Sequence, residues 1–259
     1  MASALSLSTL QASWRPLATA VILLAVMEAA KRANVLPIFV PAPSAVLLEI
    51  WNSPRLVVAN LAPTAWKAAS GYFIAAVVAI TAASLAVSLR VLRGPIYNIG
   101  VMINSVPIIA TAPLLALWLG TGPQIQIAIA ALTSQFPMLV GTMQGLQAAD
   151  SRQRELMYVL SASRVQTLRY LLIPSALPYL FAGFKIAAPS AVLGAITAEW
   201  AGADQGVGAM MLYALFSYDT AKVWLSVLLT CLLAGAGFGL WAAIERMVVY
   251  WRHDVDLVD

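Results

Sequence analysis

The chain contains about six apolar stretches that are each long enough to cross a bilayer, which needs roughly 20 mostly apolar residues. They cover residues 16–33, 65–88, 96–119, 124–146, 177–200 and 223–248. Hydrophobic residues make up 61% of the sequence and charged residues only 10%. Soluble domains have about 45–50% apolar and about 25% charged residues. The charged residues of this chain are therefore too few to cover the surface of a soluble protein. The sequence therefore predicts an all-α, polytopic membrane protein in which residues 1–259 form one transmembrane domain.

The distribution of Lys and Arg in the short loops predicts the orientation of the chain. If the N-terminus is inside, the inner side carries the arginines Arg15, Arg90, Arg93, Arg152, Arg154, Arg164, Arg169, Arg246 and Arg252. The outer side then carries Lys31, Arg32, Arg55 and Lys222. We therefore expect both termini to be cytoplasmic and the uncharged loop at 120–123 to face outward.

Several functional classes are disfavoured by residues that the sequence lacks. Its only histidine is His253 and its only cysteine is Cys231. An intramembrane Ser–His pair and a His-rich metal site are therefore ruled out. The sequence has no G-x-x-x-x-G-K-[ST] motif, so we expect no P-loop of its own. Its net charge of +4 lies in short loops beside apolar stretches, which does not indicate nucleic-acid binding.

The most distinctive polar segment is the inner loop at 148–176, between the fourth and fifth apolar stretches. Asp150 is expected to cap a helix that starts at Ser151, with Gln153 completing a capping box. A second start is expected at Ser163, with Gln166 three residues later, and a break is expected near Ser161. Pro174 and Pro178 are expected to stop this run. An amphipathic helix on the membrane surface is an equally open interpretation. Elsewhere, Ser44 is expected to cap a short helix over 45–51.

Polar side chains within the apolar stretches are candidates for a translocation pathway, since such groups usually face the bundle or water. The candidates are Asn104, Ser134, Gln135, Lys185 and Glu199. Lys185 and Glu199 lie about four turns apart on one face of the fifth stretch, which Pro189 is expected to bend. The alternative is that Lys185 extends to the inner surface, Glu199 caps the outer end, and the uncharged residues bond between helices.

Two glycine pairs have the G-x-x-x-G spacing that permits close helix packing. They are Gly141 with Gly145 and Gly235 with Gly239. Packing within one subunit is the expected role of both.

The inner loop resembles the coupling loop of the inner-membrane permeases of binding-protein-dependent ABC importers, E-A-A-x3-G-x9-I-x-L-P. Glu155 takes the first position and Pro174 the last, and Ser161 stands at the glycine position. A non-glycine residue in a left-handed conformation costs on the order of 1 kcal/mol. Residues 36–44, 105–107 and 112–122 resemble the nitrate, sulfonate and taurine branch. Glu199-Trp200 is similar to members for pyrimidine precursors or riboflavin.

The resemblance implies a type I ABC importer permease fold with a cytoplasmic coupling helix between spans 4 and 5. It implies a homodimer in a prokaryotic inner membrane, with two ABC ATPase subunits inside and a solute-binding protein outside. The chain itself would be no enzyme and bind no cofactor, because ATP and Mg belong to the partner ATPase. The solute would be a small polar or anionic molecule or a heterocyclic vitamin precursor. The residues assigned to ATPase coupling are Asp150, Arg152, Arg154, Glu155, Leu156, Ser161, Ala162, Ser163 and Pro174.

Two rival classes differ from this expectation. An ion-coupled secondary transporter would need inverted repeats and an ion site near the middle of the membrane. We find neither in the sequence. An intramembrane enzyme would need more histidines and acids than the chain contains.

Overall fold

The computed structural model describes residues 4–120 and 122–251, and the part of the chain that it describes is helical, without a strand. The expected all-α class is confirmed. The longer helices are α1 (Ala4–Arg32), α3 (Pro54–Ser88), α4 (Arg93–Ser105), α5 (Ile108–Leu119), α6 (Pro123–Gly145), α9 (Ile173–Glu199) and α11 (Thr220–Val248). The shorter ones are α2 (Pro43–Asn52), α7 (Ser151–Val159), α8 (Arg164–Thr167) and α10 (Val207–Phe216), with a 3-10 turn η1 (Arg90–Leu92) and a π-helical turn η2 (Leu168–Leu172). Thr121 and His253 lie outside the described residues.

Four helices among the described residues are long and apolar enough to cross a membrane, and a bent pair makes a fifth if it counts as one span. The four are α3, α6, α11 and the continuous run Arg164–Glu199, which includes α9. The first expected stretch, 16–33, lies largely in α1, whose side chains are described only from residue 18 onward. The polytopic architecture therefore agrees with the pattern in the sequence.

The expected span at 96–119 is bent and not one straight helix, because α4 and α5 meet at an angle of 97°. The break falls at Val106, whose backbone is extended at φ −72° and ψ 128°. Pro107 follows it, and a residue before proline avoids the helical region because the proline ring clashes with it. Proline thus ends α4 and, as the N-cap residue, precedes α5. The expected span is therefore two helices.

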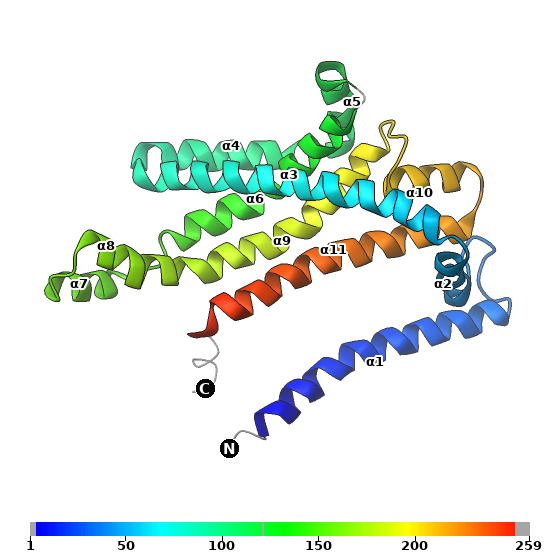
Figure 1. Cartoon of the computed structure of the whole chain (residues 1–259), viewed down its shortest axis with the longest axis horizontal. Helices are drawn as coiled ribbons and strands as arrows, with labels where there is room; N and C mark the ends of the chain where they lie inside the picture. The colour runs from blue at the N-terminus through cyan, green and yellow to red at the C-terminus, as the bar shows by residue number, and fades with distance from the viewer. Residues whose placement is uncertain (1–3, 121, 252–259) are drawn as a thin grey trace.

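The core of the bundle lies where α6 packs against α9 and α3 (Figure 1). Glycines permit this close approach. A Cβ atom at Gly141 would lie 2.7 Å from the carbonyl oxygen of Tyr179, and one at Gly183 would lie 2.6 Å from that of Pro137. The expected intrasubunit packing is confirmed for Gly141 and Gly145, which meet α9. It is wrong for Gly235 and Gly239, because no described atom lies within 4 Å of a Cβ atom built at either.

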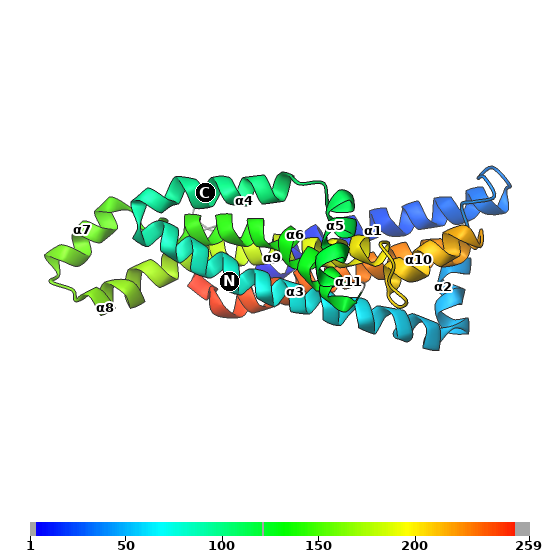
Figure 2. The same cartoon turned by 90° about the horizontal axis from the view of Figure 1, so that it is seen from above.

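The helices α7 and α8 project beyond the bundle at one end, which we call the α7 end (Figures 1 and 2). The turn η1, between α3 and α4, lies toward the same end in both views. The helix α10 lies at the opposite end, which we call the α10 end. The ends at which α1 begins and α11 stops are those nearer to α7 (Figure 1). The apolar side chains of α1 from Val21 to Val26 are mostly exposed, as suits contact with lipid.

Candidate functional site

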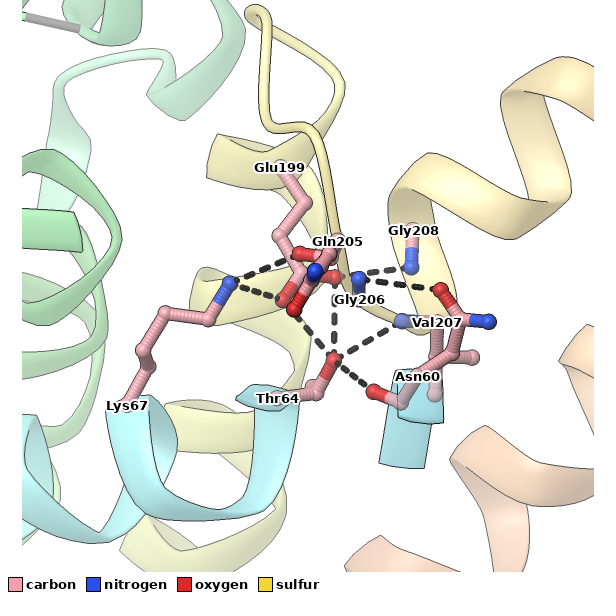
Figure 3. Close-up of polar contacts among 8 residues, drawn as sticks. All are labelled: Asn60, Thr64, Lys67, Glu199, Gln205, Gly206, Val207 and Gly208. Atoms are coloured by element: carbon pink, nitrogen blue, oxygen red, sulfur yellow. Dashed lines mark hydrogen bonds and ion pairs between the residues drawn. The ribbon is translucent and has the colours of Figure 1, made fainter. Parts of the chain in front are cut away.

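A buried ion pair lies at the α10 end, where α3, α9 and α10 meet (Figure 3). The Lys67 ammonium lies 2.7 Å from a carboxylate oxygen of Glu199, and the side chains are 5% and 0% exposed. Lys67 Nζ also donates to the carbonyl oxygen of Gln205 at 3.1 Å. Burying one charge alone costs several kcal/mol, and the contact between the two side chains offsets part of this cost.

The Glu199 carboxylate also accepts hydrogen bonds from two other elements. Thr64 Oγ1 donates to it at 2.8 Å, and the amide of Gly208 donates at 2.7 Å. A Cβ atom at Gly206 would lie 2.2 Å from this carboxylate, and one at Gly208 would lie 2.5 Å from the Ile196 carbonyl oxygen. Gly206 also has a φ of +138°, which side chains rarely allow. The glycines let the start of α10 approach Glu199.

The same contacts satisfy the start of α10. Helices leave their first amide groups without internal partners. Here the amide of Gly206 donates to Asn60 Oδ1 at 3.1 Å and that of Val207 donates to Thr64 Oγ1 at 2.8 Å. Side chains of α3 and α9 therefore cap α10 and hold the three helices together. No group of three or more His, Cys, Asp or Glu able to hold a metal occurs among the described residues.

A second ion pair joins α9 to α11 and involves Lys185. Its ammonium donates to the Glu245 carboxylate, and the two side chains are only partly exposed. Lys185 and Glu199 are therefore not brought together, because each pairs with a different helix. Their assignment to a translocation pathway remains a prediction. The helix α9 runs unbroken through Pro178 and Pro189.

The uncharged pathway candidates are placed in different surroundings. Asn104 lines a cavity of about 460 Å³ between the α4–α5 break, α6 and α9. Ser134 is buried and donates to the carbonyl oxygen of Ala130 at 2.7 Å within its own helix. The Gln135 side-chain nitrogen is buried and has no hydrogen-bond partner among the described residues. Only Asn104 of these three lines that cavity.

Four hydroxyl groups share this cavity with Asn104. They belong to Thr111, Thr133, Ser190 and Thr197, and each donates to a backbone carbonyl. Their protons are thus engaged, so their oxygens face a solute chiefly as acceptors. No charged residue lines the cavity among the described residues.

The projecting segment has the two capped helices that the sequence predicts. Asp150 and Gln153 form a capping box at the start of α7, where the Asp150 amide donates to Gln153 Oε1 at 3.1 Å. Ser163 and Gln166 form another at the start of α8, with the Ser163 amide donating to Gln166 Oε1 at 2.7 Å. Two caps within fourteen residues fix both helix starts without help from the bundle.

Ser161 has the left-handed conformation that its place in the motif predicts, with a φ of +51°. Its amide donates to the Tyr158 carbonyl oxygen at 2.9 Å, and that of Ala162 donates to the Met157 carbonyl oxygen at 3.0 Å. This pair of bonds is the Schellman ending of a helix, in which glycine usually takes the left-handed position. Since Ser163 caps α8, Ser161 serves as the turn between the helices.

The exposed side chains of α7 leave both polar and apolar groups available. Arg152, Arg154, Glu155 and Leu156 are all exposed. Glu155 forms no ion pair within residues 4–120 and 122–251. Tyr158 and Val159 are 86% and 77% exposed, which is unusual for large apolar side chains in a packed segment. This surface can contact a partner protein or the membrane surface.

Two local expectations are wrong. Pro174 and Pro178 do not stop the helical run, because Pro174 lies in the first turn of α9 and the π-helical turn η2 leads directly into it. Proline is tolerated in a first turn, whose amides have no internal partner. Ser44 is not the cap of α2, which begins at Pro43. Its amide and hydroxyl instead donate to the Glu28 carboxylate at 3.1 Å and 2.8 Å.

Asn60, Thr64 and Glu245 are not among the site residues predicted from the sequence, and no role was predicted for Lys67. Lys67 carried the available signal, because an ionisable residue within an apolar span normally has a partner. Only the folded chain shows that this partner is Glu199.

A bundle of long apolar helices with an exposed, doubly capped helix pair at one end is the architecture of a polytopic membrane protein. The chain belongs to the family of binding-protein-dependent transport system inner membrane components, which matches residues 71–249. This family consists of inner-membrane transport components, and the long apolar helices of the chain agree with a multi-pass membrane protein.

Curated relatives support the same family. A formylaminopyrimidine transport permease protein of Halalkalibacterium halodurans is 32% identical over 157 residues, which are 61% of this chain and 63% of that protein. A riboflavin transport system permease protein of Chloroflexus aurantiacus is 31% identical over 149 residues, 58% of this chain and 56% of that protein. A Bacillus subtilis permease protein named for aliphatic sulfonates transport is 28% identical over 155 residues, which are 60% of this chain and 56% of that protein. The match thus spans less than two thirds of each relative.

Proposed function

We propose that this protein is the membrane-spanning subunit of an ATP-driven importer. Partner ABC ATPases supply the energy, a solute-binding protein delivers the solute outside, and two permease copies enclose the pathway. ATP and Mg²⁺ are bound by the ATPases. The α7 end is cytoplasmic in this proposal, and so are both termini. The family membership and the helix ends in Figure 1 support it.

The observation that carries this proposal is the projecting pair α7–α8. Its two caps and its Schellman turn make it rigid, so a push on α7 passes to α9 rather than bending the loop. The exposed Arg154, Glu155 and Tyr158 offer both polar and apolar contacts. The segment continues through η2 into α9, which packs against α6, α3 and α11 in the core. It therefore has both a free docking surface and a direct link to the bundle.

The cavity with Asn104 favours one kind of solute among those of the relatives. Its hydroxyl oxygens are acceptors, and no cation lines it among the described residues. A sulfonate would meet no cationic side chain in this cavity among the described residues, and its main side-chain donor would be the Asn104 amide. A neutral heterocycle, as in the formylaminopyrimidine and riboflavin permeases, could donate N–H groups to these oxygens and place its ring on the apolar wall. We therefore propose a heterocyclic vitamin or vitamin precursor.

The proposal is tested by co-purifying the full chain with its cognate ATPase. Replacing Tyr158 and Val159 by Ser should strongly reduce the retained ATPase, because both side chains are exposed on α7. The matched control replaces Tyr250 and Met247 by Ser. These side chains are 72% and 73% exposed but lie outside α7 and α8, so this variant should retain the ATPase. Equal retention by both variants would contradict docking at α7.

A further inference from the structure

Two adjoining cavities at the α7 end share a set of arginines. One, of about 760 Å³, is lined by Arg90 and Arg93 from the α3–α4 turn and by Arg154 from α7. The other, of about 800 Å³, also contains Arg90 and Arg93. Gln147 lines both. Side chains from separate elements therefore meet around one space.

This space has a net positive charge that the described residues do not neutralise. Within the described part of the chain, no acidic residue lines either cavity. None of the three arginines pairs with a carboxylate among the described residues. Arg154 Nε donates to the Ala149 carbonyl oxygen at 3.4 Å, which leaves the terminal nitrogens of its guanidinium for other partners. Planar guanidinium groups of this kind bind phosphate oxygens in pairs.

The first cavity combines these arginines with an apolar wall. The wall includes Leu146, Leu168, Leu172, Ala176 and Leu180, from the α6 end, η2 and α9. A free phosphate ion would use the arginines and leave this wall in contact with water. An amphiphile would use both, with its phosphate on the guanidinium groups and its acyl chain on the leucines.

We propose that the cavity of Arg90, Arg93 and Arg154 binds an anionic phospholipid. The cavity lies where α3 ends and α9 begins, beside α7, so a lipid of the adjacent leaflet can reach it. Because Arg154 belongs to α7 while Arg90 and Arg93 belong to the α3–α4 turn, a headgroup bound to all three joins the two segments. The proposal holds whichever solute the protein carries.

The test uses the purified full chain in detergent, titrated with phosphatidylglycerol or with phosphatidylcholine. Thermal unfolding is followed by tryptophan fluorescence, and retained lipid by native mass spectrometry. Phosphatidylglycerol should raise the midpoint temperature of unfolding, and phosphatidylcholine should not. The double variant Arg90→Gln, Arg93→Gln should weaken phosphatidylglycerol binding by roughly tenfold or more, since it removes two charge-assisted contacts. The double variant Arg90→Lys, Arg93→Lys keeps the positive charges but loses the planar guanidinium groups. It should bind phosphatidylglycerol with intermediate strength.

The control variant is Arg164→Gln, Arg169→Gln, which loses the same charge outside both cavities. It should bind phosphatidylglycerol as the wild type does. An equal loss in this control would overturn the proposal, because the effect would then be unspecific attraction. Equal protection by inorganic phosphate, or no preference for phosphatidylglycerol over phosphatidylcholine, would also overturn it.

Discussion

Removing Lys67 should destabilise the protein more than removing any exposed lysine. In the folded chain Glu199 is fully buried, and Lys67 is its only cationic partner among the described residues. The change Lys67→Met leaves this carboxylate with only the Thr64 hydroxyl and the Gly208 amide as donors. Breaking a buried pair from one side costs about 3–5 kcal/mol. We expect a loss of this size in the free energy of unfolding.

The double variant Lys67→Met, Glu199→Gln should recover part of this loss. It removes both charges, and the side-chain oxygen of the introduced glutamine can still accept from the Gly208 amide. The remaining cost is about 1–2 kcal/mol, for imperfect hydrogen bonding. The double variant should cost less than Lys67→Met alone, so together with Glu199→Gln alone the two substitutions should be non-additive by at least about 2 kcal/mol.

The assay is reversible unfolding in mixed micelles, followed by tryptophan fluorescence. Lys222→Met is the control, since Lys222 is 35% exposed and pairs with Asp219 at 2.7 Å and more loosely with Glu49 at 3.9 Å. That pair lowers the pKa of the Asp219 carboxyl, whose side chain also caps α11. An exposed pair contributes about 0–1 kcal/mol, so the control should lose little. A loss below about 1 kcal/mol for Lys67→Met, or strict additivity in the double variant, would refute this account of the buried cluster.

Three further outcomes are expected. Ser161→Gly should leave transport intact and stabilise the fold by up to about 1 kcal/mol in chemical unfolding, because glycine relieves the left-handed strain but gains freedom when unfolded; a clear loss would show that the hydroxyl matters. Gly141→Val should lower the free energy of unfolding by about 1–3 kcal/mol, whereas Gly235→Val should change it little. Only at Gly141 would the added side chain collide with the backbone of another helix, so similar losses for both would contradict the packing of α6 on α9. In a Cys231→Ser background, a cysteine at Gln124 should be labelled from outside and one at Gln153 only from inside, and the reverse pattern would overturn the proposed orientation.

Local features of the candidate site could be predicted from the sequence because they depend on neighbouring residues. The caps at Asp150 and Ser163 need only a partner three residues away, which the sequence shows. The left-handed turn at Ser161 was instead predicted from the resemblance, because Ser161 stands at the glycine position of the motif. The break before Pro107 carried an equally local signal, but the apolar run around it favoured one long span. The prediction that Pro174 stops the helical run was wrong, because the π-helical turn η2 leads into α9 and Pro174 lies in the first turn of that helix.

The long-range contacts could not be predicted in this way. Thr64 and Glu199 are 135 residues apart, and hydropathy does not determine which polar groups of two spans lie at the same depth. The same limit applies to Lys185 and Glu245. The charges in the spans were visible as candidates, yet their partners depend on how α3, α9 and α11 pack. Gly206 and Gly208 are explained only by distant neighbours, the Glu199 carboxylate for the first and the Ile196 carbonyl and Glu199 for the second.

The most direct test of the account is the coupling of ATP hydrolysis to transport in proteoliposomes that contain the permease, its ATPase and its binding protein. The variant has Arg154, Glu155 and Leu156 all replaced by Ala, and the control has Arg246 and Met247 replaced by Ala. Solute uptake, ATP hydrolysis, membrane insertion and dimer content are measured together. We predict that the α7 variant inserts and dimerises normally but loses uptake, while the control transports normally. Full uptake with normal solute-stimulated hydrolysis in the α7 variant would contradict the assignment of α7–α8 as the coupling element.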